Sequence, residues 1–378
     1  MGIAGEKLEP IIKWAGGKER ELPYLMPYLP VKFERYMEPF VGGGALAFAV
    51  DAGQIAINDL SKELALLYRL VQRGDRDFFQ GLRQIDGTWK RLELLVDDNI
   101  EYLAAIYIDF TSEINSTEKT RDLLVEFVIN HTPGLNGLLK SDFNIGIDNF
   151  LGEVVRNLTS KMSRMKKIEK EKGKLGRGDL QDNIECAFKS ALYMHFRYLY
   201  NEAPKYELTE AFHTAIFYFI RHYCYSSMFR YNKQGKFNVP YGGISYNRKY
   251  LGNKIDYLES ERLNKHLQKV EVHCSDFEDF LSTKCPGKGD FIFFDPPYDT
   301  DFSTYSKNCF SQKDHLRLAH VFQKSEGKCM LVIKNTDFIY KLYRSKGFRI
   351  KSFDKAYQVS FQNRNNRNTE HLIITNYW

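Results

Sequence analysis

The stretch RYMEPFVGGG at residues 35–44 places three consecutive glycines directly after a short, largely apolar segment. This pattern predicts a strand over residues 35–40, a tight glycine turn, and a helix over residues 45–52. Glycine in such a turn lets the backbone bend sharply and lets a ligand approach without meeting a Cβ atom. The turn therefore has two readings: a plain strand–helix connection, or a ligand cradle that includes Gly42 and Gly44.

The next segment predicts a second strand over residues 54–58, which ends at Asp59. An acidic side chain at this place in an α/β unit can accept hydrogen bonds from a ribose diol. Beyond it, apolar residues recur at helical spacing behind Ser61, which suits the N-cap position. The glycine turn and Asp59 together predict a site for a ribose-bearing ligand.

A second α/β block is expected towards the carboxyl end of the chain. FIFF at residues 291–294 is a short continuous apolar run, which is typical of a strand buried on both faces of a parallel sheet. Residues 330–334 and 372–375 read as further strands.

The middle of the chain breaks this rhythm with helical patterns over Leu92–Asp109, Thr120–Asn130, Ile184–Tyr200 and Glu210–Tyr225. The expected fold class is therefore α/β, with a Rossmann-like lobe assembled from both ends of the chain. Residues 1–75 and 255–378 would form this catalytic lobe, and residues 76–254 would form a mainly helical lobe inserted between them.

The tetrapeptide Asp295-Pro296-Pro297-Tyr298 directly follows the FIFF strand, at the sheet edge where α/β proteins bind ligands. Prolines lack N–H donors, so the carbonyls of this turn stay available as acceptors. The Asp295 carboxylate and one such carbonyl can accept the two protons of an exocyclic amine, while Tyr298 stacks on the ring. This grip favours attack by the amine nitrogen on a sulfonium methyl group. The alternative is a proline-rich turn without chemistry.

A base inside a duplex cannot reach such a pocket. The chemistry therefore implies that the target nucleotide flips out of the helix.

Lysine and arginine exceed aspartate and glutamate by six, and the excess is concentrated between Arg156 and Arg177. That run has nine basic residues and two acidic ones, so the rest of the chain is near neutral. Clustered cations suit a polyanion, because every neutralised phosphate releases counterions. A solvated surface helix or loop explains the run equally well, and both readings stay open.

Other patterns exclude several classes of protein. The six cysteines show neither a CxxC pair nor metal-ligand spacing with histidine, which predicts reduced thiols and no metal site. No apolar run reaches membrane-spanning length, and the first ten residues lack a signal-peptide core. We therefore expect a cytoplasmic protein that binds neither a metal nor a membrane.

KWAGGK at residues 13–18 is not a phosphate-binding loop. Ile12 and Glu19 stand where that motif needs glycine and a serine or threonine. Trp14 and Lys18 instead suit an aromatic wall and a cation for the carboxylate of an amino acid.

These motifs together resemble the DNA adenine methyltransferase (Dam) family of bacteria and phages, which is the α-group of amino-methyltransferases. The resemblance rests on KWAGGK (13–18), EPFVGGGALAF (38–48), NDLSKEL (58–64), FRYNKQGKFNVPYG (229–242), FFDPPY (293–298) and FSTYS (302–306). The α-group has this order of motifs. The resemblance implies an S-adenosylmethionine-dependent methyltransferase lobe with an inserted DNA-recognition lobe, at the nucleoid of a bacterial or phage-infected cell.

The resemblance also implies roles for individual residues. The S-adenosylmethionine contacts would be Trp14, Lys18, Phe40, Gly42, Gly44, Asp59 and Asp295, and the catalytic elements would be Asp295, Pro296, Pro297 and Tyr298. In the family, the segment matching residues 225–240 enters double-stranded DNA. Its implied DNA contacts are Tyr225, Met228, Arg230, Asn232 and Pro240, with Arg364 and Arg367 on the DNA backbone.

Arg230 has a specific implied role, because an arginine fork suits the O6 and N7 atoms of guanine. A phosphate contact or an internal salt bridge is the alternative for this residue. The implied target is adenine N6, with GATC as the leading sequence and a cognate restriction endonuclease as a candidate partner.

Two departures from the family limit how far its residue roles and target sequence apply to this chain. The link between Asp59 and the 220s is much longer than usual, and Ser226 stands where GATC-methylating relatives carry asparagine. N4 of cytosine presents the same two protons as N6 of adenine. An N4-cytosine methyltransferase and a catalytically silent DNA-binding relative therefore stay as alternatives.

Overall fold

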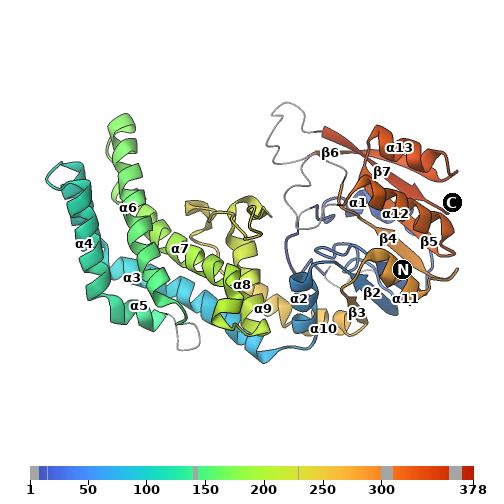
Figure 1. The fold of residues 1–378 in the computed structure, drawn as a ribbon, viewed down its shortest axis with the longest axis horizontal. Coiled ribbons are helices and arrows are strands. Elements are labelled where there is room, and N and C mark those ends of the chain that lie inside the picture. The colour runs from blue at the N-terminus through green and yellow to red at the C-terminus, as the bar shows by residue number, and fades with distance from the viewer. Residues whose placement is uncertain (1–7, 15, 139–143, 229, 299–309, 357–367) are drawn as a thin grey trace. The chain divides into compact units, whose positions relative to one another are not determined.

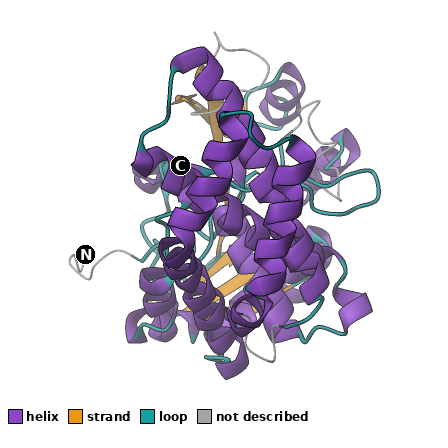
Figure 2. Cartoon of the chain, turned by 90° about the vertical axis from the view of Figure 1, so that its left-hand side faces the viewer, coloured by secondary structure: helices purple, strands orange, loops and turns teal. Residues whose placement is uncertain are grey.

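The structure, a computed structural model, describes residues 8–14, 16–138, 144–228, 230–298, 310–356 and 368–378 (Figure 1). The chain divides into two compact units. The first unit joins the two ends of the chain, Met1–Arg73 and Leu258–Trp378, and the second is Gly74–Tyr257. Strands belong to the first unit, whereas long helices dominate the second (Figures 1 and 2).

The first unit is built on one seven-stranded sheet with the order β3-β2-β1-β4-β5-β7-β6. The five strands from β3 to β5 pair in parallel, and β7 is antiparallel to both of its neighbours. The strands are β1 (Arg35–Glu38), β2 (Gln54–Asn58), β3 (Val270–His273), β4 (Phe291–Phe294), β5 (Lys328–Lys334), β6 (Arg349–Ala356) and β7 (Asn368–Thr375).

The centre of the sheet is buried on both faces. All four residues of β4 have no exposed surface, and each buried phenylalanine contributes about 1.5–3 kcal/mol. One face is covered by the apolar sides of α11 (Phe277–Lys284), α12 (Gln312–Lys324) and α13 (Asp337–Arg344). This burial explains why β4 reads as a continuous apolar run rather than as an alternating strand.

The order of the strands places a switch point between β1 and β4. The chain continues from β1 to β2 on one side and from β4 to β5 on the other. Tyr36 lies opposite Phe291 and Met37 opposite Ile292, so the two strands end beside each other. In open α/β sheets, ligands bind outside the carboxyl ends of the strands at such a point.

The second unit consists of helices. Its principal helices are α3 (Arg76–Thr111), α4 (Thr117–Asn130), α5 (Thr132–Leu138), α6 (Ile147–Lys172), α7 (Arg177–Asn201) and α8 (Glu210–Tyr223). The other described helices and 3-10 turns of the chain are α1 (Leu22–Leu25), η1 (Met26–Tyr28), α2 (Lys62–Gln72), η3 (Ala203–Tyr206), η4 (Tyr225–Ser227), η5 (Ile244–Tyr246), α9 (Gly252–Leu258) and α10 (Glu261–Leu267). Within the described ranges, none of these helices has both the length and the apolar character needed to span a membrane.

The predicted α/β fold class is confirmed, and the strands over residues 54–58 and 291–294 are found at the expected bounds. The helix predicted over residues 45–52 is wrong. Residues 45–49 form turns instead. Their hydrogen bonds mix the i→i+4 spacing of Phe48 N to Gly44 O with the i→i+3 spacing of Ala49 N to Leu46 O, both at 2.9 Å, so no regular α-helix is built.

Candidate active site at the carboxyl edge of the sheet

The glycine turn after β1 requires glycine at two positions. Gly42 has a φ of +49° and Gly44 a φ of +76°. A Cβ atom on Gly42 would lie 2.7 Å from Cδ1 of Trp14, and one on Gly44 would lie 2.6 Å from the Tyr68 hydroxyl. That hydroxyl donates to Gly42 O at 3.0 Å. The turn is therefore packed between Trp14 and Tyr68, which brings the N-terminal KWAGGK motif to the glycines.

Asp59 closes the turn from the end of β2. Its Oδ2 accepts a hydrogen bond from the Gly42 N–H at 3.1 Å, and its Oδ1 accepts one from the Ser61 N–H at 2.9 Å. Burial raises the pKa of the Asp59 carboxyl, and the two backbone donors oppose that rise. The carboxylate thus has a defined orientation beside Gly42.

Asn58 was not predicted as a site residue, yet it ties three strand ends together. Its Nδ2 donates to Pro39 O at 3.0 Å and to Ser275 O at 2.9 Å, and its Oδ1 accepts from Ser275 N at 2.9 Å. Pro39 follows β1 and Ser275 follows β3. A buried asparagine at the end of an apolar strand was the available signal, since such a group needs partners.

Lys18 meets the Asp295 carboxylate. Its Nζ lies 2.5 Å from Asp295 Oδ2 and donates to Gly16 O at 2.8 Å. The Lys18 side chain is only 3% exposed, and a second carboxylate, that of Glu21, lies 3.9 Å from the same nitrogen. The ammonium also lies 5.2 Å from the centre of the Tyr298 ring. The sequence predicted both Lys18 and Asp295 as site residues, but it did not predict that they pair.

Glu38 is a further buried acid at this edge, and sequence reasoning assigned it no role. Tyr36 Oη donates to Glu38 Oε2 at 2.8 Å, and both side chains are buried. Burial raises the pKa of Glu38 well above its ordinary value, and the negative charge of Asp295 adds to the rise. The signal was present in the sequence, because an acid that ends a buried strand beside a glycine turn is unusual.

The remaining residues of the tetrapeptide differ in exposure. Pro296 is buried, Pro297 is exposed and Tyr298 is half-buried. The Tyr298 ring meets the imidazole of His371 edge to face, with 5.2 Å between ring centres. β7 therefore supports this tyrosine from the side of the antiparallel strand.

Three aromatic rings gather beyond the ends of β1 and β3. Phe40 lies 5.4 Å from Phe277 and 5.6 Å from Phe310, measured between ring centres. Phe277 and Phe310 are 6.0 Å apart. Only Phe40 was predicted to be near a ligand, because the other two residues come from distant parts of the chain.

Five of the predicted DNA contacts, the residues between Tyr225 and Pro240, lie in the helical unit on a hairpin-like segment after α8. Isolated β-bridges join Cys224 to Tyr241 and Tyr231 to Phe237. Tyr225 is 46% exposed, and Ser226 and Ser227 both have a φ of +52°, which is uncommon for residues other than glycine. Such backbone conformations persist where neighbouring structure imposes them.

The other predicted DNA contacts on this segment have partners within it. Arg230 donates from Nε to Asn238 Oδ1 at 3.0 Å and from Nη2 to Asn238 O at 3.4 Å. Asn232 Oδ1 accepts from Gln234 N at 3.0 Å and Lys236 N at 2.9 Å, which stabilises the turn at the tip.

Met228 and Pro240 complete this set. Met228 is half-buried, whereas Pro240 is exposed and its carbonyl accepts from Tyr225 N at 2.8 Å. The predicted backbone contacts Arg364 and Arg367 lie outside the described residues. In the described part of the chain, no three histidine, cysteine or acidic side chains are grouped so that they could bind a metal ion.

Comparisons with known proteins place the chain in one family. A family model described as "D12 class N6 adenine-specific DNA methyltransferase" matches residues 14–191 and 179–359. The chain is 25% identical over 375 residues to the type II methyltransferase M.CviBI of Paramecium bursaria Chlorella virus NC1A, which covers 98% of this chain and 100% of the relative. It is 26% identical to the type II methyltransferase M.MjaIII of Methanocaldococcus jannaschii, over 91% of this chain and 90% of the relative.

A third relative is more similar to this chain, but over a shorter stretch. The retron Ec67 DNA adenine methylase of Escherichia coli is 31% identical over 165 residues, which is 43% of this chain and 54% of that protein.

Proposed function

The chain belongs to the D12 class of N6 adenine-specific DNA methyltransferases, and on that premise we propose that Asp295 directs methyl transfer from S-adenosylmethionine to an adenine flipped out of duplex DNA. The observation that carries the proposal is the position of Asp295. It follows β4 at the switch point of the sheet, beside the glycine turn that follows β1. Two ligands can meet there, one over each strand end.

The donor set at the glycine turn fits S-adenosylmethionine. Asp59 offers a carboxylate to a ribose diol, and Phe40 with its neighbouring rings offers an apolar wall to a planar base. Lys18 and Trp14 suit the amino-acid end of the cofactor, because an ammonium binds a carboxylate. When bound, this cofactor supplies a methyl group on a positively charged sulfur.

The residues of the tetrapeptide would hold the adenine. Asp295 would accept one proton of the N6 amine in a hydrogen bond, and a carbonyl of the turn would accept the other. Tyr298 would stack on the base. Asp295 would then take the proton that the nitrogen loses, and the ammonium of Lys18 beside Oδ2 stabilises negative charge on this carboxylate until that step. The contribution of the protein is orientation and electrostatics.

The helical unit would supply recognition of the DNA. The segment 225–240 would enter the duplex with Tyr225, Met228, Asn232 and Pro240 near the bases and with Arg230 on a guanine. GATC is the leading candidate for the target sequence. A restriction endonuclease of the same specificity is a candidate partner, because two of the relatives are type II methyltransferases by name.

The test is Asp295→Ala. We expect methyl transfer to fall about 100-fold or more, because the variant loses the group that positions the amine. Nucleosides from treated DNA would be separated and identified by mass spectrometry. Asp51→Ala is the matched control, since that aspartate is 96% exposed in the same unit.

Three outcomes would count against the proposal. Turnover by Asp295→Ala at the wild-type rate would remove this residue from the mechanism. N4-methylcytosine without N6-methyladenine would change the target base. No transfer to any DNA by the wild-type protein would point to a silent relative.

A further inference from the structure

Polar residues occupy every fourth position along α7, namely Glu185, Lys189, Tyr193, Arg197 and Asn201. Each lies about one turn beyond the last and about 40° further around the helix axis, so these side chains form a stripe about 24 Å long that winds around the helix. We refer to these five residues as the α7 stripe. Every member makes a polar contact with the segment 237–248, which continues from the proposed DNA-reading hairpin.

Towards the C-terminal end of α7, the stripe binds the backbone of the hairpin. Asn201 donates from Nδ2 to Phe237 O at 2.9 Å and accepts from Phe237 N at 2.8 Å. Nearer the middle of the helix, Tyr193 Oη donates to Val239 O at 2.9 Å, and Arg197 Nη1 donates to the same oxygen at 3.0 Å. Asn201 thus bonds both the N–H and the C=O of Phe237, as a residue of a neighbouring strand does in a hydrogen-bonded pair.

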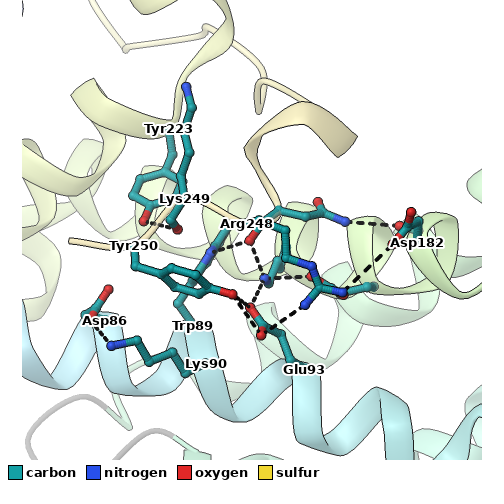
Figure 3. A network of polar contacts seen from close by, with 12 residues as sticks. Asp86, Trp89, Lys90, Glu93, Asp182, Tyr223, Arg248, Lys249 and Tyr250 are labelled. Carbon is teal, nitrogen blue, oxygen red and sulfur yellow. Dashed lines mark hydrogen bonds and ion pairs between the residues drawn. The ribbon is translucent and has the colours of Figure 1, made fainter. Parts of the chain in front are cut away.

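The other end of the stripe holds residues 247 and 248 in a buried polar network (Figure 3). The Lys189 side chain is fully buried, and its Nζ lies 2.5 Å from Asn247 O and 2.7 Å from Glu185 Oε1. Glu93 of α3 lies 2.5 Å from the same nitrogen. An ammonium removed from water is tolerated only with such partners.

Arg248 brings a second cation to this network. Its guanidinium lies 3.1 Å from Glu93 Oε2, 3.0 Å from Glu185 Oε2 and 3.9 Å from Asp182 Oδ1 (Figure 3). The Arg248 side chain is 58% exposed, so it forms the outer edge of the network. Undocking Arg248 would leave Lys189 as the one cation of this pair beside Glu93 and Glu185, which favours the docked position of the segment on the helix.

These contacts also fix the register of the segment along α7. A shift of the segment by one residue would move the N–H and C=O groups of Phe237 and Val239 away from Asn201, Arg197 and Tyr193, and these side chains would lose their hydrogen bonds. An unsatisfied buried polar group costs about 1–3 kcal/mol. The stripe thus discriminates strongly against a slipped hairpin.

The register matters for Arg230 because Asn238 stands between the two anchored residues. Asn238 Oδ1 accepts from Arg230 Nε at 3.0 Å, and the Asn238 N–H donates to Arg230 O at 3.1 Å. A chain of direct contacts therefore runs from the α7 stripe through Phe237 and Val239 to Asn238 and the Arg230 guanidinium.

We infer that the α7 stripe is a positioning device that orients Arg230 and so sets the sequence specificity of methylation. The inference rests on the proposed function, in which the hairpin enters DNA. It gives one helix of the inserted lobe, α7, a specific role that the sequence did not predict. Its members act through the hairpin and need not touch DNA.

The experiment compares two variants of the stripe, Asn201→Ala and Tyr193→Phe. Sequencing of DNA methylated by the wild-type protein first identifies the preferred site. Rates are then measured on duplexes with that site and with a substitution at each guanine position. We expect each variant to lower the ratio of preferred to substituted rates about tenfold at one guanine, which corresponds to about 1.4 kcal/mol.

A double-mutant cycle separates positioning from general stability. In a protein that already carries Arg230→Ala, adding Asn201→Ala should lower the specificity ratio no further. Both substitutions act on the same contact, the one between the Arg230 guanidinium and guanine. Amide hydrogen exchange should also become faster at Phe237 and Asn238 in the stripe variants. Tyr102→Phe is the matched control for Tyr193→Phe, since Tyr102 is exposed on α3 of the same unit.

The outcomes distinguish the two proposals. An unchanged ratio in both stripe variants, with a lower melting temperature alone, would overturn the positioning role. If Arg230→Ala leaves the ratio unchanged, the DNA-reading assignment of the hairpin fails and the inference fails with it. Loss of specificity in Arg230→Ala but not in the stripe variants would overturn the inference and leave the proposed function in place.

Discussion

At the scale of single residues, two carboxyl groups at the carboxyl edge of the sheet have opposite environments. Asp295 lies against the Lys18 ammonium, whereas Glu38 is buried and accepts a hydrogen bond from the neutral Tyr36 hydroxyl. A cation favours the ionised form of an acid, and burial favours the protonated form. Glu38 is the last residue of β1 and Asp295 directly follows β4, so two neighbouring strand ends carry acids in different surroundings.

We predict that Glu38 makes the protein less stable as the pH rises. Its pKa in the folded protein is raised, so folding takes up a proton where the pH lies between the pKa of the unfolded chain and the raised pKa. The stability present below about pH 4.5 should therefore fall as the pH rises through the raised pKa. Glu38→Gln should remove this dependence.

The measurement is the free energy of unfolding in urea for both proteins between pH 5 and 8. Glu326→Gln, at an exposed glutamate of the same unit, is the control. A constant difference between wild type and Glu38→Gln across this range would show that Glu38 is ionised in the folded protein.

At the scale of elements, α7 also contains a buried histidine that is not part of the stripe. His195 has no exposed surface, and its Nδ1 lies 3.3 Å from Asn149 Oδ1 of α6. Burial lowers the pKa of His195 to about 3. The packing of α6 against α7 thus depends on a neutral imidazole.

We predict that acid weakens this helix pair. The unfolded chain protonates His195 near pH 6.5, whereas the folded protein keeps it neutral, so stability is lost as the pH falls below 6.5. Lowering the pH from 6.5 to 5 should cost about 2 kcal/mol through this residue. Urea unfolding followed by circular dichroism of the helices would measure this loss of unfolding free energy. We expect a smaller loss in His195→Gln, and His320→Gln is the control at an exposed histidine. Equal losses in all three proteins would contradict the prediction.

At the scale of the whole molecule, the basic run between Arg156 and Arg177 is less uniform than its sequence. Several of its cations have partners within the helical unit: Lys166 donates to Phe110 O at 2.5 Å, and Lys170 lies 3.5 Å from Glu113. Arg177 pairs with Glu101. Lys170 and Arg177 contribute less to a phosphate-binding surface, because carboxylates offset part of their charge, whereas Lys166 keeps its charge but is held at a carbonyl oxygen.

We predict that the exposed remainder of the run, Arg164, Lys167, Lys172 and Lys174, contributes to the salt dependence of DNA binding. Replacing all four by glutamine should flatten the slope of log K against log salt by about 0.9 for each DNA phosphate that the variant no longer neutralises. Fluorescence anisotropy with duplex DNA at several salt concentrations would measure it. The control replaces four exposed lysines of the other unit, Lys313, Lys324, Lys341 and Lys351. An unchanged slope would identify the run as a solvated surface.

Local patterns in the sequence were enough to predict the fold class and the family. A continuous apolar run predicted β4 at its observed bounds, and the tetrapeptide after it led to the prediction that Asp295 is a site residue. Gly42 and Gly44 were predicted to form a tight turn, and the structure shows positive φ at both. The short helix after them was mispredicted, because a pattern over so few residues does not show whether a turn continues into a regular helix.

Which distant groups meet depends on the tertiary fold. Lys18 and Asp295 are 277 residues apart in the chain, yet Lys18 Nζ lies 2.5 Å from Asp295 Oδ2. The α7 stripe is visible as a spacing of four, yet nothing local to α7 identifies the segment 237–248 as its partner. Periodicity reports which face of an element is buried, whereas pairing between elements depends on strand order and helix packing, which involve the whole chain at once.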